Sequence, residues 1–268
     1  MEKLSITTIQ TDLHWENREA NLNMFTEKIR SIEGNTHVVV LPEMFATGFT
    51  MKPEQYAETM EGTSVSWMRM MAKEKNIILA GSLSIKEGEE FFNRFIWMLP
   101  NGQQGQYDKR HCFTLGGEDE HYSPGSKRVI ASVGGWRINL QICYDLRFPV
   151  WARQQTQPDP EQEPSPEYDL IINVANWPEK RSNHWKTLLQ ARAIENQSYV
   201  VGVNRVGLDG NGLNHSGDSM VIDPFGEILY HCSAKEEINT AVLEKSKLEE
   251  IRGKFGFWKD GDPFMIIS

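Results

Sequence analysis

The chain has 268 residues, of which 39% are hydrophobic and 24% charged, with a formal net charge of −9. This composition is typical of a globular protein and argues against extensive disorder. The negative charge and the lack of a basic cluster disfavour nucleic acid as a partner, so we expect a small molecule instead. No apolar run approaches the roughly 20 residues that a membrane-spanning helix needs, and the first residues do not resemble a signal peptide.

Three cysteines, Cys112, Cys143 and Cys232, cannot form a complete set of disulfides. Their spacing lacks the Cys-x-x-Cys pattern that is typical of a structural zinc site. Free thiols persist in the reducing cytoplasm, so we predict a cytoplasmic protein.

Short apolar or alternating runs predict strands along most of the chain. Patterns with one apolar face predict helices over residues 17–32, 63–74 and 183–196. Tight turns are expected at 86–90 and 209–217, which favours mixed sheets with helices on their outer faces, in an α/β fold. The predicted strands are residues 4–10, 37–41, 77–85, 91–99, 129–132, 136–143, 170–174, 199–206, 218–223 and 239–243.

Residues 155–168 form an acidic, proline-rich stretch, which we interpret as an exposed loop because the strand pattern continues on both sides. Residues 1–268 are therefore predicted to form a single domain, with a C-terminal extension from about residue 245. The aromatic segment 251–268 packs either on this domain or across a neighbouring subunit.

Two charged residues follow predicted strands. Pro42 ends the buried strand 37–41, so Glu43 comes to its carboxyl end, where open α/β sheets place their ligands. An exposed loop carboxylate is the alternative. Lys109 follows a short turn and is a second candidate for the site; the alternative is that it is an ordinary solvated lysine. Neighbouring residues of an extended chain point to opposite faces, so His111 and Cys112 are not expected to act as a pair.

Cys143 ends the strand 136–143, on its more polar face. Asp145 is a candidate N-cap for a short helix over 146–153. A helix N-terminus lowers the pKa of a nearby thiol, which would make Cys143 reactive. The alternative is an inert buried cysteine, because free cysteine is among the most buried residue types.

Together these segments resemble the nitrilase, or carbon–nitrogen hydrolase, superfamily, which carries a Glu, a Lys and a Cys in this order. Further stretches that resemble the family extend the match from about residue 4 to residue 243. The matching segments are 42–45, 108–111, 122–125, 143–149, 173–178, 190–196, 217–219 and 223–227.

The resemblance implies a four-layer α-β-β-α sandwich that forms homodimers or higher homo-oligomers and needs no metal or cofactor. It implies that Cys143 is the nucleophile, Glu43 the base and Lys109 the support of the oxyanion, aided by the backbone N–H of Tyr144. It also implies a second glutamate near the site, for which Glu118 is the candidate and Glu120 the competitor.

Residues 43–49 with 176–178 resemble the omega-amidase branch, which hydrolyses the terminal amide of short 2-oxo-dicarboxylic acid monoamides such as 2-oxoglutaramate or 2-oxosuccinamate. Arg147 is a candidate to bind the substrate carboxylate, with a structural ion pair as the alternative. Phe49, Tyr144, Phe148 and Trp177 are candidate pocket walls. A nitrilase or an N-carbamoyl amide hydrolase is the alternative function, and a metal-dependent phosphoesterase or an inactive scaffold are more remote ones.

Overall fold

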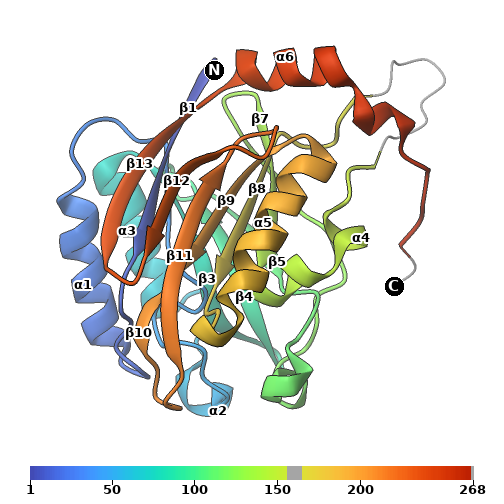
Figure 1. The fold of residues 1–268 in the computed structure, drawn as a ribbon. Coiled ribbons are helices and arrows are strands. Elements are labelled where there is room, and N and C mark those ends of the chain that lie inside the picture. The colour runs from blue at the N-terminus through green and yellow to red at the C-terminus, as the bar shows by residue number, and fades with distance from the viewer. Residues whose placement is uncertain (156–164, 267–268) are drawn as a thin grey trace.

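Two β-sheets lie face to face at the centre of the protein (Figure 1) in a computed structural model that describes residues 1–155 and 165–266. The first sheet has the strand order β13-β1-β2-β3-β4-β5 and the second β10-β11-β9-β8-β7-β6, with β12 paired to β11. The first sheet is built from β1 (Lys3–Gln10), β2 (Val38–Val40), β3 (Ile78–Glu87), β4 (Glu90–Met98), β5 (Gln104–Asp108) and β13 (Glu237–Glu244). The second is built from β6 (Ile130–Val133), β7 (Trp136–Ile142), β8 (Leu170–Ala175), β9 (Tyr199–Asn204), β10 (Val206–Leu208), β11 (Asn214–Ile222) and β12 (Ile228–Ser233).

Helices cover the outer face of each sheet. On the first sheet, α1 (Arg18–Arg30) and α3 (Thr63–Lys75) bury an apolar face that includes Phe25 and Met68. On the second sheet, α5 (Ser182–Asn196) buries Trp185 and Leu189. A continuous apolar core fills the space between the two sheets. The predicted four-layer α-β-β-α sandwich is confirmed.

The strand β2 shows why the site lies where it does. Val38 and Val40 face the core between the sheets, and Val39 faces the helices, so the strand is buried on both sides. β2 runs parallel to β1 and β3, while β7 runs parallel to β8 in the other sheet. Pockets in α/β folds lie beyond the carboxyl ends of such parallel strands, and Glu43 and Cys143 both follow strands of this kind.

The structure corrects several predicted elements. β5, β10 and β12 were not predicted, and β11 begins at Asn214, inside the segment expected to be a turn. β5 and β12 are polar or mixed and lie at edges or near edges of their sheets, where alternation of apolar residues is weakest. The short helix expected over 146–153 is instead a 3₁₀ turn, Cys143–Arg147, followed by α4 (Pro149–Ala152).

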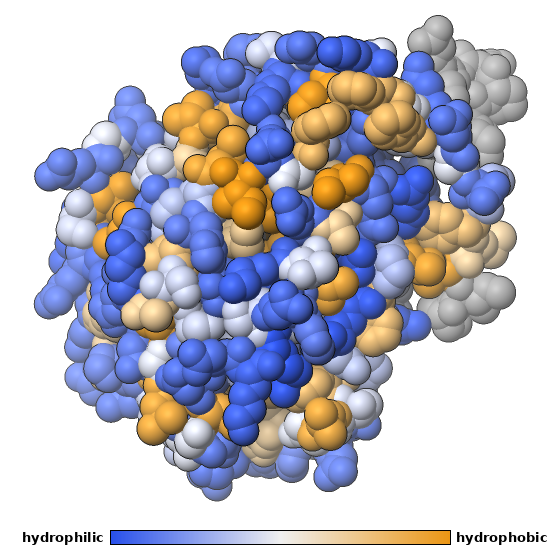
Figure 2. Space-filling view, viewed as in Figure 1, coloured by the Kyte–Doolittle hydropathy of each residue, from blue (hydrophilic) through white to orange (hydrophobic). Residues whose placement is uncertain are grey.

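The remaining helices are α2 (Pro53–Tyr56) and α6 (Lys245–Phe255). The C-terminal segment begins with α6; Trp258 in it is buried against its own chain, whereas Phe257 is exposed. Most of the predicted acidic loop, residues 156–164, lies outside the described residues, as do residues 267–268. Figure 2 shows a largely hydrophilic face broken by separate hydrophobic groups. Among the described residues, no helix is long and apolar enough to cross a membrane.

Candidate active site

Cys143 lies at a sharp turn between β7 and the 3₁₀ turn that follows it. Its φ of +44° falls in the left-handed region, which L-residues other than glycine rarely adopt. Such a conformation costs on the order of 1–3 kcal/mol and persists only where surrounding contacts impose it. Cys143 is partly buried and lines a pocket, so the turn presents its thiol to that pocket.

Asp145 supplies the contacts that impose this turn. Its buried carboxylate accepts hydrogen bonds from the backbone N–H of Ile142 (3.0 Å), the Tyr107 hydroxyl (2.7 Å) and the backbone N–H of His111 (3.0 Å). The prediction that Asp145 is an N-cap is wrong. The helical turn begins at Cys143, three residues before the expected start at residue 146, so Asp145 lies inside the turn and its side chain reaches back to the end of β7.

Glu43 is fully buried just beyond β2, and three donors fix its carboxylate. Oε1 accepts from the Lys109 ammonium (2.9 Å) and from the Asn93 amide (2.8 Å). Oε2 accepts from the backbone N–H of Asn176 at 2.8 Å. Asn176 also donates from its side chain to the Glu43 carbonyl, so the loop after β8 holds Glu43 in place.

Lys109 follows β5 directly and is buried between two carboxylates. Its Nζ lies 2.7 Å from Oε2 of Glu118 and 2.9 Å from Oε1 of Glu43. Burial alone would lower the pKa of Lys109, but the charges of Glu118 and Glu43 outweigh it and raise the pKa well above its usual value. The ammonium therefore stays charged throughout the physiological range.

Glu118 is buried beside Lys109, and Glu120 is exposed. Glu118 also accepts from the backbone N–H of Phe113 (2.6 Å) and the Asn93 amide (3.1 Å). Burial raises the pKa of Glu118, and the Lys109 charge opposes that rise. Of the two glutamates between which the sequence left a choice, the structure places Glu118 in the site.

Burial raises the pKa of the Cys143 thiol well above its usual value, and the negative charge of Glu43 adds to this effect. The Lys109 charge acts in the opposite direction but does not outweigh them. The lowered pKa that was expected for Cys143 is therefore wrong, because burial and the charge of Glu43 raise this pKa instead. A thiol in this setting needs a base to accept its proton as it reacts.

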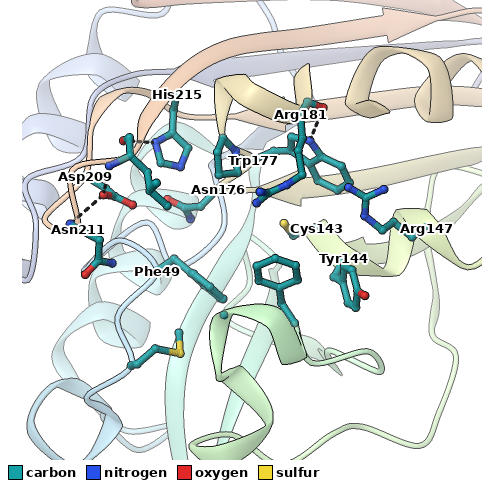
Figure 3. Close-up of a pocket in the computed structure, with 15 residues that line it drawn as sticks. Phe49, Cys143, Tyr144, Arg147, Asn176, Trp177, Arg181, Asp209, Asn211 and His215 are labelled. Atoms are coloured by element: carbon teal, nitrogen blue, oxygen red, sulfur yellow. Dashed lines mark hydrogen bonds between the residues drawn. The ribbon is translucent and has the colours of Figure 1, made fainter. Parts of the chain in front are cut away.

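The pocket beside Cys143 is lined by aromatic, polar and charged side chains, including two arginines and one aspartate (Figure 3). Four of the predicted substrate-binding residues line it, namely Phe49, Tyr144, Arg147 and Trp177. The other lining residues are Met51, Phe113, Gly116, Asn176, Pro178, Arg181, Asp209, Asn211, Leu213 and His215.

Phe148 does not line this pocket, so its prediction as a wall is wrong. Its ring stacks on His111, with 3.7 Å between the ring centroids, and faces a separate hollow. Proximity to Cys143 in the sequence was a poor guide because the turn sends neighbouring side chains in different directions.

Sequence reasoning missed Asn93 and Arg181 entirely and gave Asn176 no role of its own. Asn93 has no distinguishing pattern, since it lies in the middle of β4. Asn176 belongs to a segment that resembles the family, which was a usable signal. In the described parts of the chain, no group of three or more His, Cys, Asp or Glu side chains is placed to hold a metal ion.

The fold and this site match a known family. The family model described as Carbon-nitrogen hydrolase matches residues 5–253. The chain therefore belongs to the carbon–nitrogen hydrolase family, and the resemblance read from the sequence is confirmed.

Individual relatives are similar over the whole chain. Omega-amidase YafV of Escherichia coli (strain K12) is 43% identical over 267 residues, which cover 99% of this chain and 100% of that protein. The 2-oxoglutaramate amidase of Bacillus subtilis (strain 168) is 30% identical over 261 residues, or 96% of this chain and 97% of that protein. The structure of XC1258 from Xanthomonas campestris, a CN-hydrolase superfamily protein with an arsenic adduct in its active site, superposes with a TM-score of 0.96 and 38% identity over 100% of both chains.

Proposed function

We propose that this chain is an omega-amidase, which hydrolyses the terminal amide of a short 2-oxo-dicarboxylic acid monoamide such as 2-oxoglutaramate. The observation that carries the proposal is the buried group formed by Glu43, Lys109 and Glu118 next to Cys143 in an accessible pocket. The similarity to an omega-amidase and to a 2-oxoglutaramate amidase supports this substrate class.

In the first step the Cys143 sulfur attacks the amide carbon while Glu43 accepts the thiol proton. Because the pKa of Cys143 is raised, the attack depends on this transfer to a base within reach. Negative charge then develops on the former carbonyl oxygen. The Lys109 ammonium stabilises this charge together with the backbone N–H of Tyr144, which lies in the first turn after β7, where such groups have no partner within the turn.

In the second step the carbon–nitrogen bond breaks. Glu43 returns its proton to the nitrogen, so ammonia leaves and a thioester remains on Cys143. Glu43 then accepts a proton from water as the water attacks the thioester, and it returns that proton to the sulfur as the acid departs. Glu118 touches Lys109 in the structure, so we assign it the role of positioning this ammonium.

The first test is ammonia release from 2-oxoglutaramate by the purified protein and by Cys143→Ala. We expect release by the wild type and none above background by the variant, because the thioester cannot form. Equal release by both would overturn the role of Cys143. No release by either would overturn the omega-amidase assignment, and a panel of nitriles and N-carbamoyl compounds would then distinguish the alternative carbon–nitrogen hydrolases.

A matched pair of variants tests the second glutamate. In Glu118→Gln the ammonium of Lys109 loses one of its two charged partners, and we expect kcat to fall by about 10²-fold or more as this oxyanion donor is displaced. Glu120→Gln removes an exposed carboxylate nearby and should leave kcat unchanged. The opposite order of effects would assign the role to Glu120.

Two further expectations remain proposals. We propose a homodimer or higher homo-oligomer, which light scattering on the purified protein would measure. We also propose that the enzyme works in the cytoplasm, which is supported by its three free cysteines.

A further inference from the structure

Arg181 is a cation in the pocket that the sequence did not indicate. It ends the 3₁₀ turn Glu179–Arg181, just before α5, and lines the same pocket as Cys143 and Arg147. In Figure 3 its side chain points into the pocket toward Cys143, and Arg147 enters the same part of the pocket from the turn that carries the nucleophile.

Both guanidinium groups lie on aromatic rings. Arg147 lies 4.6 Å from the centroid of the Trp177 ring, and Arg181 lies 5.3 Å from that of Phe113. Across residues 1–155 and 165–266, no carboxylate lies within salt-bridge distance of either group. The closest polar side-chain contact of Arg147 is a 3.3 Å approach to Nδ1 of His184.

Two other arginines of this protein have a counter-charge. Arg94 and Arg252, which are buried, each form a salt bridge with an aspartate. Arg147 and Arg181 are half-buried. Even partial burial of a guanidinium without a counter-charge is unfavourable, and a second cation nearby makes it more so. Burial and the charge of Arg181 indeed lower the pKa of Arg147. The alternative that Arg147 is a structural ion-pair partner finds no support among the described residues.

We propose that Arg147 and Arg181 together bind the carboxylate of the substrate, and that Arg181 determines the specificity of the pocket for anionic amides. This inference rests on the proposed function, since it names the group that such a substrate presents. A carboxylate between the two cations supplies the counter-charge that both lack. The planar guanidinium fork suits a carboxylate, and stacking on Trp177 and Phe113 holds each fork in place before the substrate arrives.

The substrate class follows from this arrangement. Cys143 and both arginines line one pocket, so the amide and the anionic group must be joined by a short chain. The favoured substrate is therefore a monoamide of a short dicarboxylic acid. A neutral amide of the same length would leave both cations without a counter-charge.

The test compares two five-carbon amides, glutaramate, which ends in a carboxylate, and pentanamide, which ends in a methyl group. We expect the wild type to favour glutaramate in kcat/KM, and Arg181→Gln to reduce this preference by about 10- to 100-fold, as for loss of a charged hydrogen bond. Arg181→Lys keeps the charge but not the planar fork, so its preference for glutaramate should lie between those of the wild type and Arg181→Gln. Lys180→Gln, an exposed cation in the same turn, should leave the preference unchanged.

A binding measurement separates this inference from the proposed function. Calorimetry with glutarate requires no turnover, and we expect Arg181→Gln to weaken its binding by at least tenfold relative to wild type and Lys180→Gln. Loss of binding in Arg181→Gln alone would support the anion site even if no amide were hydrolysed. An unchanged substrate preference together with unchanged glutarate affinity would overturn the inference while leaving the amidase assignment intact.

Discussion

For the Cys143 thiol, the negative charge of Glu43 has a larger effect on the pKa than the positive charge of Lys109. Burial and the Glu43 charge both raise the pKa of this thiol, so the resting enzyme carries a protonated sulfur at neutral pH. Glu43 thus opposes the formation of a free thiolate, whereas the proposed mechanism makes it the base during attack. These two effects of one residue have opposite signs and can be measured separately.

We predict that Glu43→Gln lowers the pKa of Cys143 while it reduces hydrolysis. Removing the negative charge favours the thiolate, so the pH profile of alkylation by iodoacetamide should shift to lower pH. Without a base, kcat should fall by about 10²- to 10⁴-fold. Alkylation rates between pH 6 and 10 check the first effect, and ammonia release checks the second. A shift of the alkylation profile to higher pH would show that Glu43 assists ionisation instead of opposing it.

At the scale of elements, the junction between β7 and its 3₁₀ turn depends on Asp145. This carboxylate binds the last N–H of β7 and also the Tyr107 hydroxyl of β5, the strand that ends just before Lys109. Asp145 thereby fixes Cys143 and Lys109 relative to each other. The Tyr107 hydroxyl accepts in turn from the indole of Trp151 at 3.0 Å, which extends the network to α4.

The Asp145→Asn substitution replaces one carboxylate oxygen by an amide nitrogen. That nitrogen cannot accept the hydrogen bond that a backbone N–H now donates to the oxygen. We expect kcat to fall by about tenfold or more with little change in KM, because the residue positions Cys143 without lining the pocket. Loss of hydrogen bonds to a charged group should also cost about 1.5–3 kcal/mol of unfolding free energy. Asp119→Asn, an exposed neighbour of Glu118, serves as the control. An unchanged kcat in Asp145→Asn would mean that the turn holds its shape without this carboxylate.

The sequence predicted those parts of the site that local pattern determines. Glu43 and Cys143 follow apolar strands, and together with Lys109 they match the family in order. Three strands were missed: β5 is polar, β12 is mixed without a regular alternation, and β10 has only three residues. Arg181 and Asn93 reach the site only through the tertiary packing of distant segments, so no local pattern marks them. The start of the turn at Cys143 was misplaced because a positive φ at a residue other than glycine leaves no signal in the sequence.

On the scale of the whole molecule, α6 connects the two sheets. The helix follows β13 of the first sheet, and its basic side chains bind Asp169 at the start of β8 in the second. Lys245 and Arg252 contact this carboxylate at 2.7 Å and 3.0 Å, and Arg137 of β7 contacts it at 2.9 Å. Burial alone would raise the pKa of Asp169, but hydrogen bonds from Arg137 and Lys245 outweigh it and lower the pKa to about 2.

We predict that Asp169→Asn destabilises the fold by about 3–5 kcal/mol at pH 7, because the buried Arg252 loses its counter-charge. The folded pKa of Asp169 is lower than the unfolded one, so its ionisation stabilises the protein above the usual pKa of 3.8. That contribution, about 2 kcal/mol, disappears as the pH falls from about 4 toward 2. The stability gap between wild type and variant should therefore narrow over this window in urea unfolding. Asp260→Asn, which changes an exposed aspartate of the same C-terminal segment, should be as stable as the wild type. If the stability difference between wild type and Asp169→Asn stayed constant down to pH 2, the charge of Asp169 would not stabilise the contact between α6 and the second sheet.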